Sequence, residues 1–163
     1  MNGATPRRAD AVTRLEAAYG GPSQSGFGSA VFRQVLKDGD DLTQAALSTY
    51  RTFVGQRWQR YGEAAWMGPW RAVYAREPSA RPDIDTELRG IADPDARQSV
   101  PMILDNIEGA EAGRAALSAV FDDPTVTELR VFNLGDGAAM SGLLVAGRCG
   151  DSGETTYLVF LMD

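Results

Sequence analysis

The sequence predicts a single α+β domain, 1–163, in which helices over the first two-thirds pack on a C-terminal antiparallel sheet of three or more strands. Apolar residues recur at helical spacing through residues 30–123, which indicates a mainly helical region. Three stretches within 125–163 are rich in Val, Leu, Thr, Tyr and Phe and are separated by turns that contain glycine, which indicates antiparallel strands. A chain of 163 residues also suits one domain.

The N-terminal segment, residues 1–29, has its own character. A short helix is expected from about Asp10, followed by a stretch dominated by Gly, Ser and Pro at residues 20–29. Such a stretch is typical of a flexible loop, so the N-terminal helix is expected to be able to move relative to the rest. In residues 30–37 the apolar side chains are spaced as in a helix, which predicts a short helix there.

The next helices are predicted by apolar stripes and by residues that stop or start a helix. The expected ranges are 42–61, 69–76, 83–91, 100–107 and 109–121. The first is the clearest, with Asp40 or Asp41 available to cap its start and Gly62 to stop its end. Asp122, Asp123 and a proline terminate the last.

Strands are predicted at 125–134, 140–149 and 155–162. The last has apolar residues at both its odd and its even positions, so it is expected to be buried on both faces. Helices can cover one face of this meander. The other face needs a cover too: the N-terminal helix, curvature of the sheet around a pocket, or a second subunit.

The stretch L-G-D-G-A-A-M-S-G-L, residues 134–143, is the most motif-like in the chain. A dinucleotide-binding loop requires G-x-G-x-x-G before a helix. Here Met140 occupies the position of the third glycine, and a predicted strand follows. Asp136 and Gly137 between apolar runs instead predict a hairpin turn, because glycine accepts a positive φ.

Composition limits the partners and the setting. The 16 basic residues against 22 acidic ones give a net charge of −6, which argues against a general affinity for nucleic acid. No apolar run approaches the length of a membrane span, and no apolar run follows the N-terminal arginines as in a signal peptide. We therefore expect a cytoplasmic protein with neither nucleic acid nor membrane as a partner. Arginine supplies nearly all the basic residues, which suggests a GC-rich bacterial genome.

Candidate chemistry is restricted because the chain has no histidine and one cysteine, Cys149. Catalysis by Ser-His-Asp or Cys-His groups is excluded, as are a histidine or thiolate metal site and a disulfide. The acidic clusters at 38–41, 83–87 and 122–123 are interpreted as helix caps or solvated surface. We therefore assign no catalytic residue, metal or cofactor, and the question of an activity stays open with a preference for none.

The best candidate for a binding surface is a stretch that combines tryptophan, tyrosine and arginine, residue types favoured at interface hot spots. Its members are Arg57, Trp58, Arg60, Tyr61, Trp66, Trp70, Arg71 and Tyr74. Residues 51–80 carry a net charge of +3, whereas residues 81–123 carry −6. In the alternative interpretation the three tryptophans belong to the core and the arginines pair with the acids of 81–123.

Three functions follow from these observations. The first is a non-catalytic module that binds another protein, as an immunity or antitoxin-like partner, an adaptor or a regulatory subunit. The second is a small-molecule pocket, because the order of elements is loosely similar to that of cone-shaped NTF2-like proteins. Proteins of that kind bind small apolar ligands and in some cases catalyse isomerisation or dehydration, for which Tyr50 or Tyr157 with a buried aspartate would be the apparatus here. The third is a homo-oligomer, such as a homodimer, that assembles through its sheet. We prefer the first.

Overall fold

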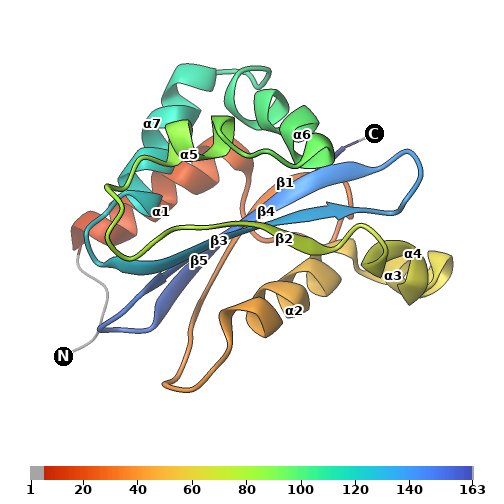
Figure 1. Cartoon of the computed structure of the whole chain (residues 1–163), viewed down its shortest axis with the longest axis horizontal. Helices are drawn as coiled ribbons and strands as arrows, with labels where there is room; N and C mark the ends of the chain where they lie inside the picture. Colours follow the sequence, from red (N-terminus) through yellow and green to blue (C-terminus); the bar gives the residue numbers. More distant parts are fainter. Residues whose placement is uncertain (1–5, 163) are drawn as a thin grey trace.

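The computed structural model describes residues 6–162, and Figure 1 shows how its elements are arranged. In chain order they are α1 (Pro6–Tyr19), β1 (Gly28–Val35), α2 (Leu42–Val54), α3 (Gln56–Tyr61), α4 (Glu63–Met67), β2 (Arg71–Ala75), α5 (Ile84–Arg89), α6 (Pro94–Leu104), α7 (Ala110–Phe121), β3 (Val126–Gly135), β4 (Ser141–Cys149) and β5 (Glu154–Met162). The fold is therefore α+β, as the sequence predicts. None of the helices within the described range is long and apolar enough to span a membrane.

The strands form one antiparallel sheet in the order β1-β5-β4-β3-β2. The predicted meander of three strands is confirmed as β3, β4 and β5. The sheet is larger than this meander because β1 pairs with β5 and β2 pairs with β3 at its two edges. The predicted turn at 134–143 is confirmed as the β3–β4 connection, where Gly137 has a φ of 77° and Asp136 accepts the N–H groups of Ala138 and Met140.

Two predicted helices are strands. Residues 30–37 lie mostly in β1, which pairs with β5 from Gly28 opposite Leu161 to Val35 opposite Glu154. Residues 69–76 contain β2, an edge strand beside β3. In both stretches a short apolar run fits either a helix or a strand, and pairing with a neighbouring strand decides the outcome. The region 30–123 thus contains both edge strands of the sheet as well as helices.

The predicted helix 42–61 is two helices, because the chain bends at Gly55. Gly55 has φ 63° and ψ −132°, a conformation that is essentially restricted to glycine. Asp41 caps the first helix by accepting the N–H of Gln44 at 3.2 Å, and Gly62 ends the second, both as predicted. The bend lets α3 and α4 leave the axis of α2 at the end of the sheet (Figure 1).

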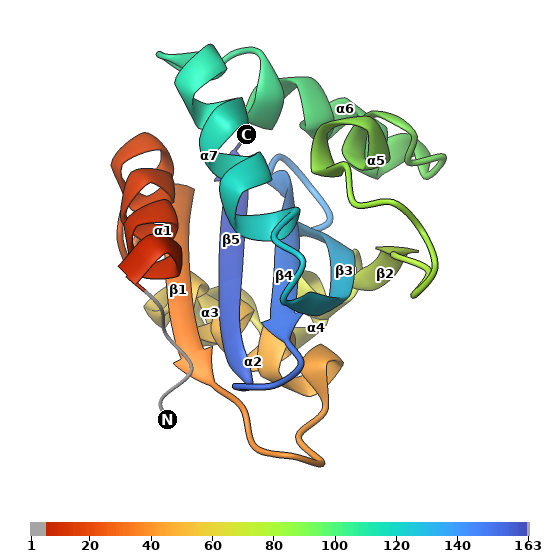
Figure 2. The ribbon, with the colours of Figure 1, turned by 90° about the vertical axis from the view of Figure 1, so that its left-hand side faces the viewer.

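Helices cover both faces of the sheet, as Figures 1 and 2 show. The helices α1, α5, α6 and α7 cover one face, and α2, α3 and α4 the other. Along β5, Leu158 and Phe160 belong to the core on the first face, whereas Tyr157 and Val159 belong to the core on the second. The predicted burial of this strand on both faces is confirmed, and the covering helices account for it without a second copy of the chain.

The first helix contributes to one of these cores. Val12 and Leu15 in α1 are fully buried, and α1 packs beside α7 (Figure 2). The loop 20–27 is also in contact with the body of the protein, since the N–H of Gly26 donates to the carbonyl of Phe53 at 2.9 Å. Movement of α1 relative to the rest stays a prediction.

The bend at Gly55 yields a stability prediction. A Cβ added to Gly55 would lie 3.0 Å from the carbonyl oxygen of Gln24, in addition to the strain of the positive φ. We expect Gly55→Ala to lower the free energy of unfolding by about 2 kcal/mol in chemical denaturation. The matched control is Gly62→Ala, where φ is 88° but no atom lies within 4 Å of the added Cβ. Equal losses in the two variants would contradict a role for the contact with Gln24.

Candidate functional site

The three tryptophans belong to one aromatic cluster with Tyr50 and Phe132. The ring of Trp70 stacks on Phe132 at 4.7 Å and on Tyr50 at 5.5 Å between centroids, and Tyr50 meets the edge of Trp58 at 5.3 Å. The side chains of Trp58 and Trp66 are 4% and 1% exposed, whereas Trp70 is partly exposed. Two of the three tryptophans therefore pack the second core and attach α3 and α4 to it.

Tyr50 fastens this cluster to the sheet. Its hydroxyl lies 2.9 Å from the carbonyl oxygen of Gly135 and 3.2 Å from that of Trp66, which links α2 to β3 and α4. Burial raises the pKa of Tyr50 well above its usual value, so the group is neutral. Burial likewise raises the pKa of Tyr157, whose hydroxyl donates to the side-chain oxygen of Gln34 at 2.7 Å. Both hydroxyls thus make structural bonds.

Arg71 and Tyr74, which the sequence assigns to the binding surface, make hydrogen bonds to carboxylates of the same chain. The guanidinium of Arg71 makes hydrogen bonds to Asp93 at 2.7 Å and to Asp95 at 2.9 Å. The hydrogen bond from Arg71 holds the pKa of Asp93 at about 2. The hydroxyl of Tyr74 donates to the carboxylate of Glu87. These contacts attach β2 to α5 and to the start of α6.

Arg76 makes the most buried of these ion pairs. Its Nε lies 2.9 Å and 3.1 Å from the two oxygens of Glu87, and its Nη2 lies 3.1 Å from Asp122. The side chains of Arg76 and Glu87 are only 7% and 10% exposed. Burial by itself raises the pKa of Glu87, but the hydrogen bonds from Arg76 and Tyr74 outweigh it, so the pKa lies below its usual value.

The remaining three candidate residues, Arg57, Arg60 and Tyr61, are exposed on α3. Arg57 donates to the carbonyl of Gly26 at 3.4 Å, and the guanidinium of Arg60 lies 5.7 Å from the ring centroid of Tyr61. Within residues 6–162, neither arginine forms an ion pair with a carboxylate. The structure thus divides the eight candidates into buried or partly buried aromatic residues, residues bonded to acids, and this exposed group.

Arg51 belongs with the exposed group, although it is not among the eight residues that the sequence predicts for the binding surface. It lies on α2, and its guanidinium carbon lies 5.3 Å from the ring centroid of Trp58. The sequence does contain a signal for it: residues 42–62 include three arginines and neither Asp nor Glu, in a chain with 22 acidic residues. We name Arg51, Arg57, Arg60 and Tyr61 the basic surface.

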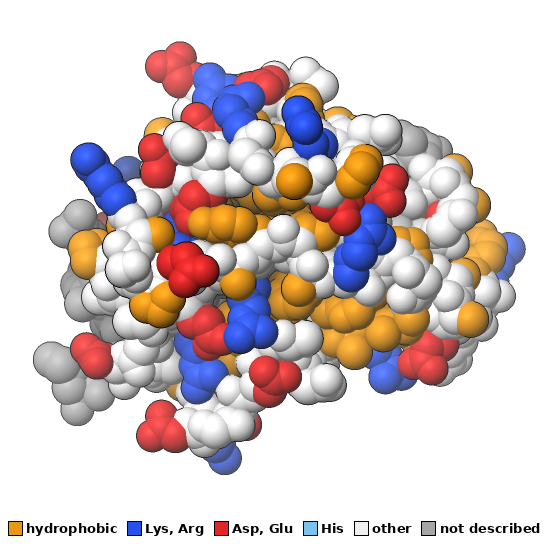
Figure 3. Space-filling view, viewed as in Figure 1, with side chains coloured by type: hydrophobic (Ala, Val, Ile, Leu, Met, Phe, Trp, Pro, Cys, Tyr) orange, Lys and Arg blue, Asp and Glu red, His pale blue; other side chains and the backbone are white. Residues whose placement is uncertain are grey.

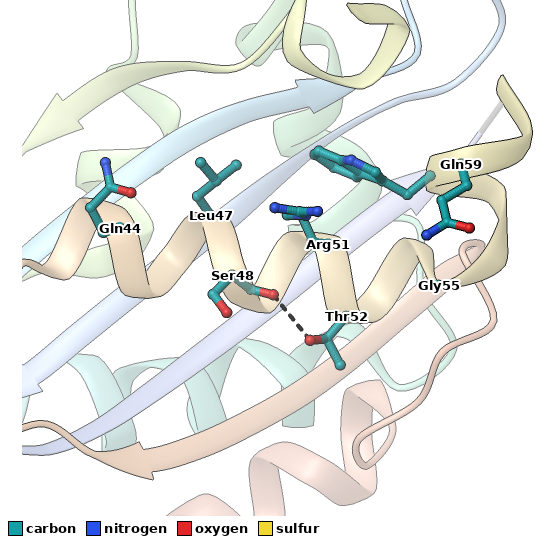
Figure 4. Close-up of a pocket in the computed structure, with 8 residues that line it drawn as sticks. Gln44, Leu47, Ser48, Arg51, Thr52, Gly55 and Gln59 are labelled. Carbon is teal, nitrogen blue, oxygen red and sulfur yellow. Dashed lines mark hydrogen bonds between the residues drawn. The ribbon is translucent and has the colours of Figure 1, made fainter. Parts of the chain in front are cut away.

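Two hollows lie at the basic surface. The larger, about 410 Å³, is shown in Figure 4 and is lined by Gln44, Leu47, Ser48, Arg51, Thr52, Gly55, Trp58 and Gln59. The second, about 330 Å³, is lined by Gln24, Ser25, Val54, Gln56, Arg57 and Arg60. Neither lining includes an acidic residue. Figure 3 shows an apolar area on the face that carries α2 and β2, with both basic and acidic side chains at its border.

Comparison of the chain with protein-family models, with curated proteins and with solved structures finds no match.

Among the described residues, no group of three His, Cys, Asp or Glu side chains is placed to hold a metal ion. Cys149 is buried, and its Sγ lies 3.5 Å from the hydroxyl oxygen of Thr125.

The Arg76–Glu87 pair yields a prediction of pH dependence. Because the pKa of Glu87 is lowered on folding, its contribution to stability is present above its ordinary value of 4.5 and is lost as the pH falls through the lower folded value. We expect Glu87→Gln to lower the free energy of unfolding at pH 7 by about 3 kcal/mol, because Arg76 is left buried without its main partner. The loss should shrink as the pH is lowered from 5 to 3, as measured by denaturation at each pH.

The matched control for this experiment is Glu108→Gln, because Glu108 is exposed. This variant should follow the pH dependence of the unmodified protein. A difference between Glu87→Gln and the unmodified protein that stays constant from pH 7 to pH 3 would contradict the lowered pKa.

The hydroxyl of Tyr50 yields a second prediction for the site. Tyr50→Phe leaves the carbonyls of Gly135 and Trp66 without this partner, so we expect the free energy of unfolding to fall by about 2 kcal/mol. Tyr61→Phe is the control, because Tyr61 is 57% exposed and its loss should stay within about 0.5 kcal/mol. Denaturant titrations followed by tryptophan fluorescence measure both, and similar values for the two variants would refute the role of Tyr50.

Proposed function

We propose that this chain is a non-catalytic module that binds an acidic surface of another protein through the basic surface. Roles of this kind are those of an adaptor, a regulatory subunit, or an immunity or antitoxin-like partner. The observation that carries the proposal is the absence of any acidic residue from 42–62, where Arg51, Arg57 and Arg60 are all exposed.

The basic surface differs from the rest of the molecule, where other arginines are paired with carboxylates. Arg71, Arg76 and Arg89 each pair with carboxylates of residues 85–122, so their charge is neutralised within the chain. With a net charge of −6, the protein as a whole repels an acidic partner. A local positive surface on such a molecule favours one orientation of approach and one site of contact.

The residue types of the basic surface, and the aromatic rings that hold its arginines in position, also favour binding. Arginine and tyrosine are enriched among the residues that contribute most to protein interfaces. Arg51 lies over Trp58, and Arg60 lies over Tyr61, so both guanidinium groups are positioned by an aromatic ring. Burial of Trp58 and Trp66 holds α3, which carries Arg57 and Arg60, in place. A surface that is ordered before contact loses less conformational entropy on binding.

The test compares three tagged baits in extracts of the native cells. They are the unmodified protein, the double variant Arg57→Glu/Arg60→Glu, and Arg97→Glu, a control at an exposed arginine of α6. We expect one protein to be captured by the unmodified and control baits and lost from the double variant. That protein is then purified and its complex measured by isothermal titration calorimetry, where affinity should fall as salt is raised from about 0.1 M to about 1 M.

Circular dichroism verifies that each bait is folded. The proposal is wrong if every captured protein binds the double variant as well as the control. It is equally wrong if the purified complex forms with an affinity that neither Arg57 and Arg60 nor salt affects.

A further inference from the structure

The larger hollow is a groove along one exposed side of α2. Figure 4 shows Gln44, Leu47 and Arg51 projecting in succession from the same side of this helix, with Gln59 of α3 at the far end. Positions that are three or four residues apart share one face of a helix, so the groove follows the helix axis. Ser48 and Thr52 line its other side, and the hydroxyl of Thr52 is already bonded to the carbonyl of Ser48 at 3.0 Å.

Hydrogen-bond donors dominate the arginine end of this groove. Arg51 is exposed and has no carboxylate partner among residues 6–162. The indole N–H of Trp58, which lines the groove, is buried and has no acceptor there, whereas the indole N–H of Trp66 donates to the carbonyl of Arg57 at 3.0 Å. A guanidinium has five N–H donors and no acceptor. The complementary group for this end is therefore an anion with acceptor oxygens.

We propose that this groove seats a glutamate or aspartate side chain from an extended, acidic segment of the partner protein, with its carboxylate on Arg51. This inference rests on the proposed function, because it names the part of the partner that the basic surface receives. A carboxylate matches the fork of a guanidinium in two parallel hydrogen bonds, which gives direction as well as attraction.

The neighbouring Leu47 indicates a second feature of that segment, an apolar side chain near the carboxylate. Leu47 lies four positions before Arg51, so the two are about 6 Å apart along the helix axis. Side chains two residues apart in an extended chain lie on the same side at a spacing of about 6.6 Å. The segment is thus expected to place an apolar side chain two residues from its carboxylate, so that Leu47 is covered while Arg51 is paired.

The probe is the capped tripeptide acetyl-Leu-Gly-Glu-amide, added at millimolar concentration to the ¹⁵N-labelled full chain. Indole N–H signals of Trp58, Trp66 and Trp70 are assigned from the variants Trp58→Phe and Trp70→Phe. We expect the signal of Trp58 to move in a saturable way, because a negative charge arrives beside the ring that carries Arg51. The signal of Trp66, whose indole is bonded to the backbone, should move less.

Two controls isolate the carboxylate and the arginine. The peptide with Gln in place of Glu should bind about tenfold more weakly, and so should the original peptide with Arg51→Gln, since each loses a charge-assisted hydrogen bond. Arg97→Gln is the matched protein control and should leave the affinity unchanged.

The inference is overturned if the Gln peptide binds as well as the Glu peptide, or if Arg51→Gln binds as well as Arg97→Gln. It is also overturned if inorganic phosphate moves the Trp58 signal at lower concentration than the peptide. A shift of that signal with protein concentration alone would place a second copy of the chain in the groove. If the natural partner depends on Arg57 and Arg60 but not on Arg51, this inference fails while the proposed function stands.

Discussion

Burial of the central strands on both faces is the constraint on which the rest of the structure depends. In β4, Leu143 and Val145 enter one core while Leu144 and Ala146 enter the other, and β5 alternates in the same way. Because each face of these strands removes apolar surface from water, each requires its own cover. The helices are therefore divided between the two faces, and the chain passes from α1 on one face through the edge strand β1 to α2 on the other (Figure 1).

This division also decides where charge is neutralised. The acids of residues 83–122 lie on the side of α5, α6 and α7, where they meet the arginines of β2 and of the segment that follows it. Arg76 in particular is nearly buried, and an unpaired charge in that position would be costly. The other layer carries Glu63 at the start of α4 and Asp41 at the N-cap of α2, but among the described residues neither forms an ion pair with Arg51, Arg57 or Arg60. These arginines consequently remain available at the surface.

The proposed site shows how composition and fold combine. Tryptophan and arginine in residues 57–76 together predict a binding surface from the sequence. In the structure the two residue types have different roles. Trp58 and Trp66 anchor α3 and α4 to the second core, while Arg57 and Arg60 on the same short helix face solvent. Sequence spacing in so short a helix does not distinguish these faces. Arg51 lies outside the stretch that combines tryptophan, tyrosine and arginine, and its position 5.3 Å from the ring centroid of Trp58 is given only by the structure.

The sequence by itself determined the class of the fold, the β3–β4–β5 meander, the turn at Asp136–Gly137 and the two-sided burial of β5, because these depend on local alternation and on turn residues. It also excluded the chemistry that requires histidine or paired cysteines. Only the tertiary structure decided that residues 30–37 and 69–76 are strands, since a short apolar run acquires its conformation from the strand it pairs with. The same holds for the arginines: whether a guanidinium is neutralised depends on carboxylates far away in sequence, as Asp122 is from Arg76.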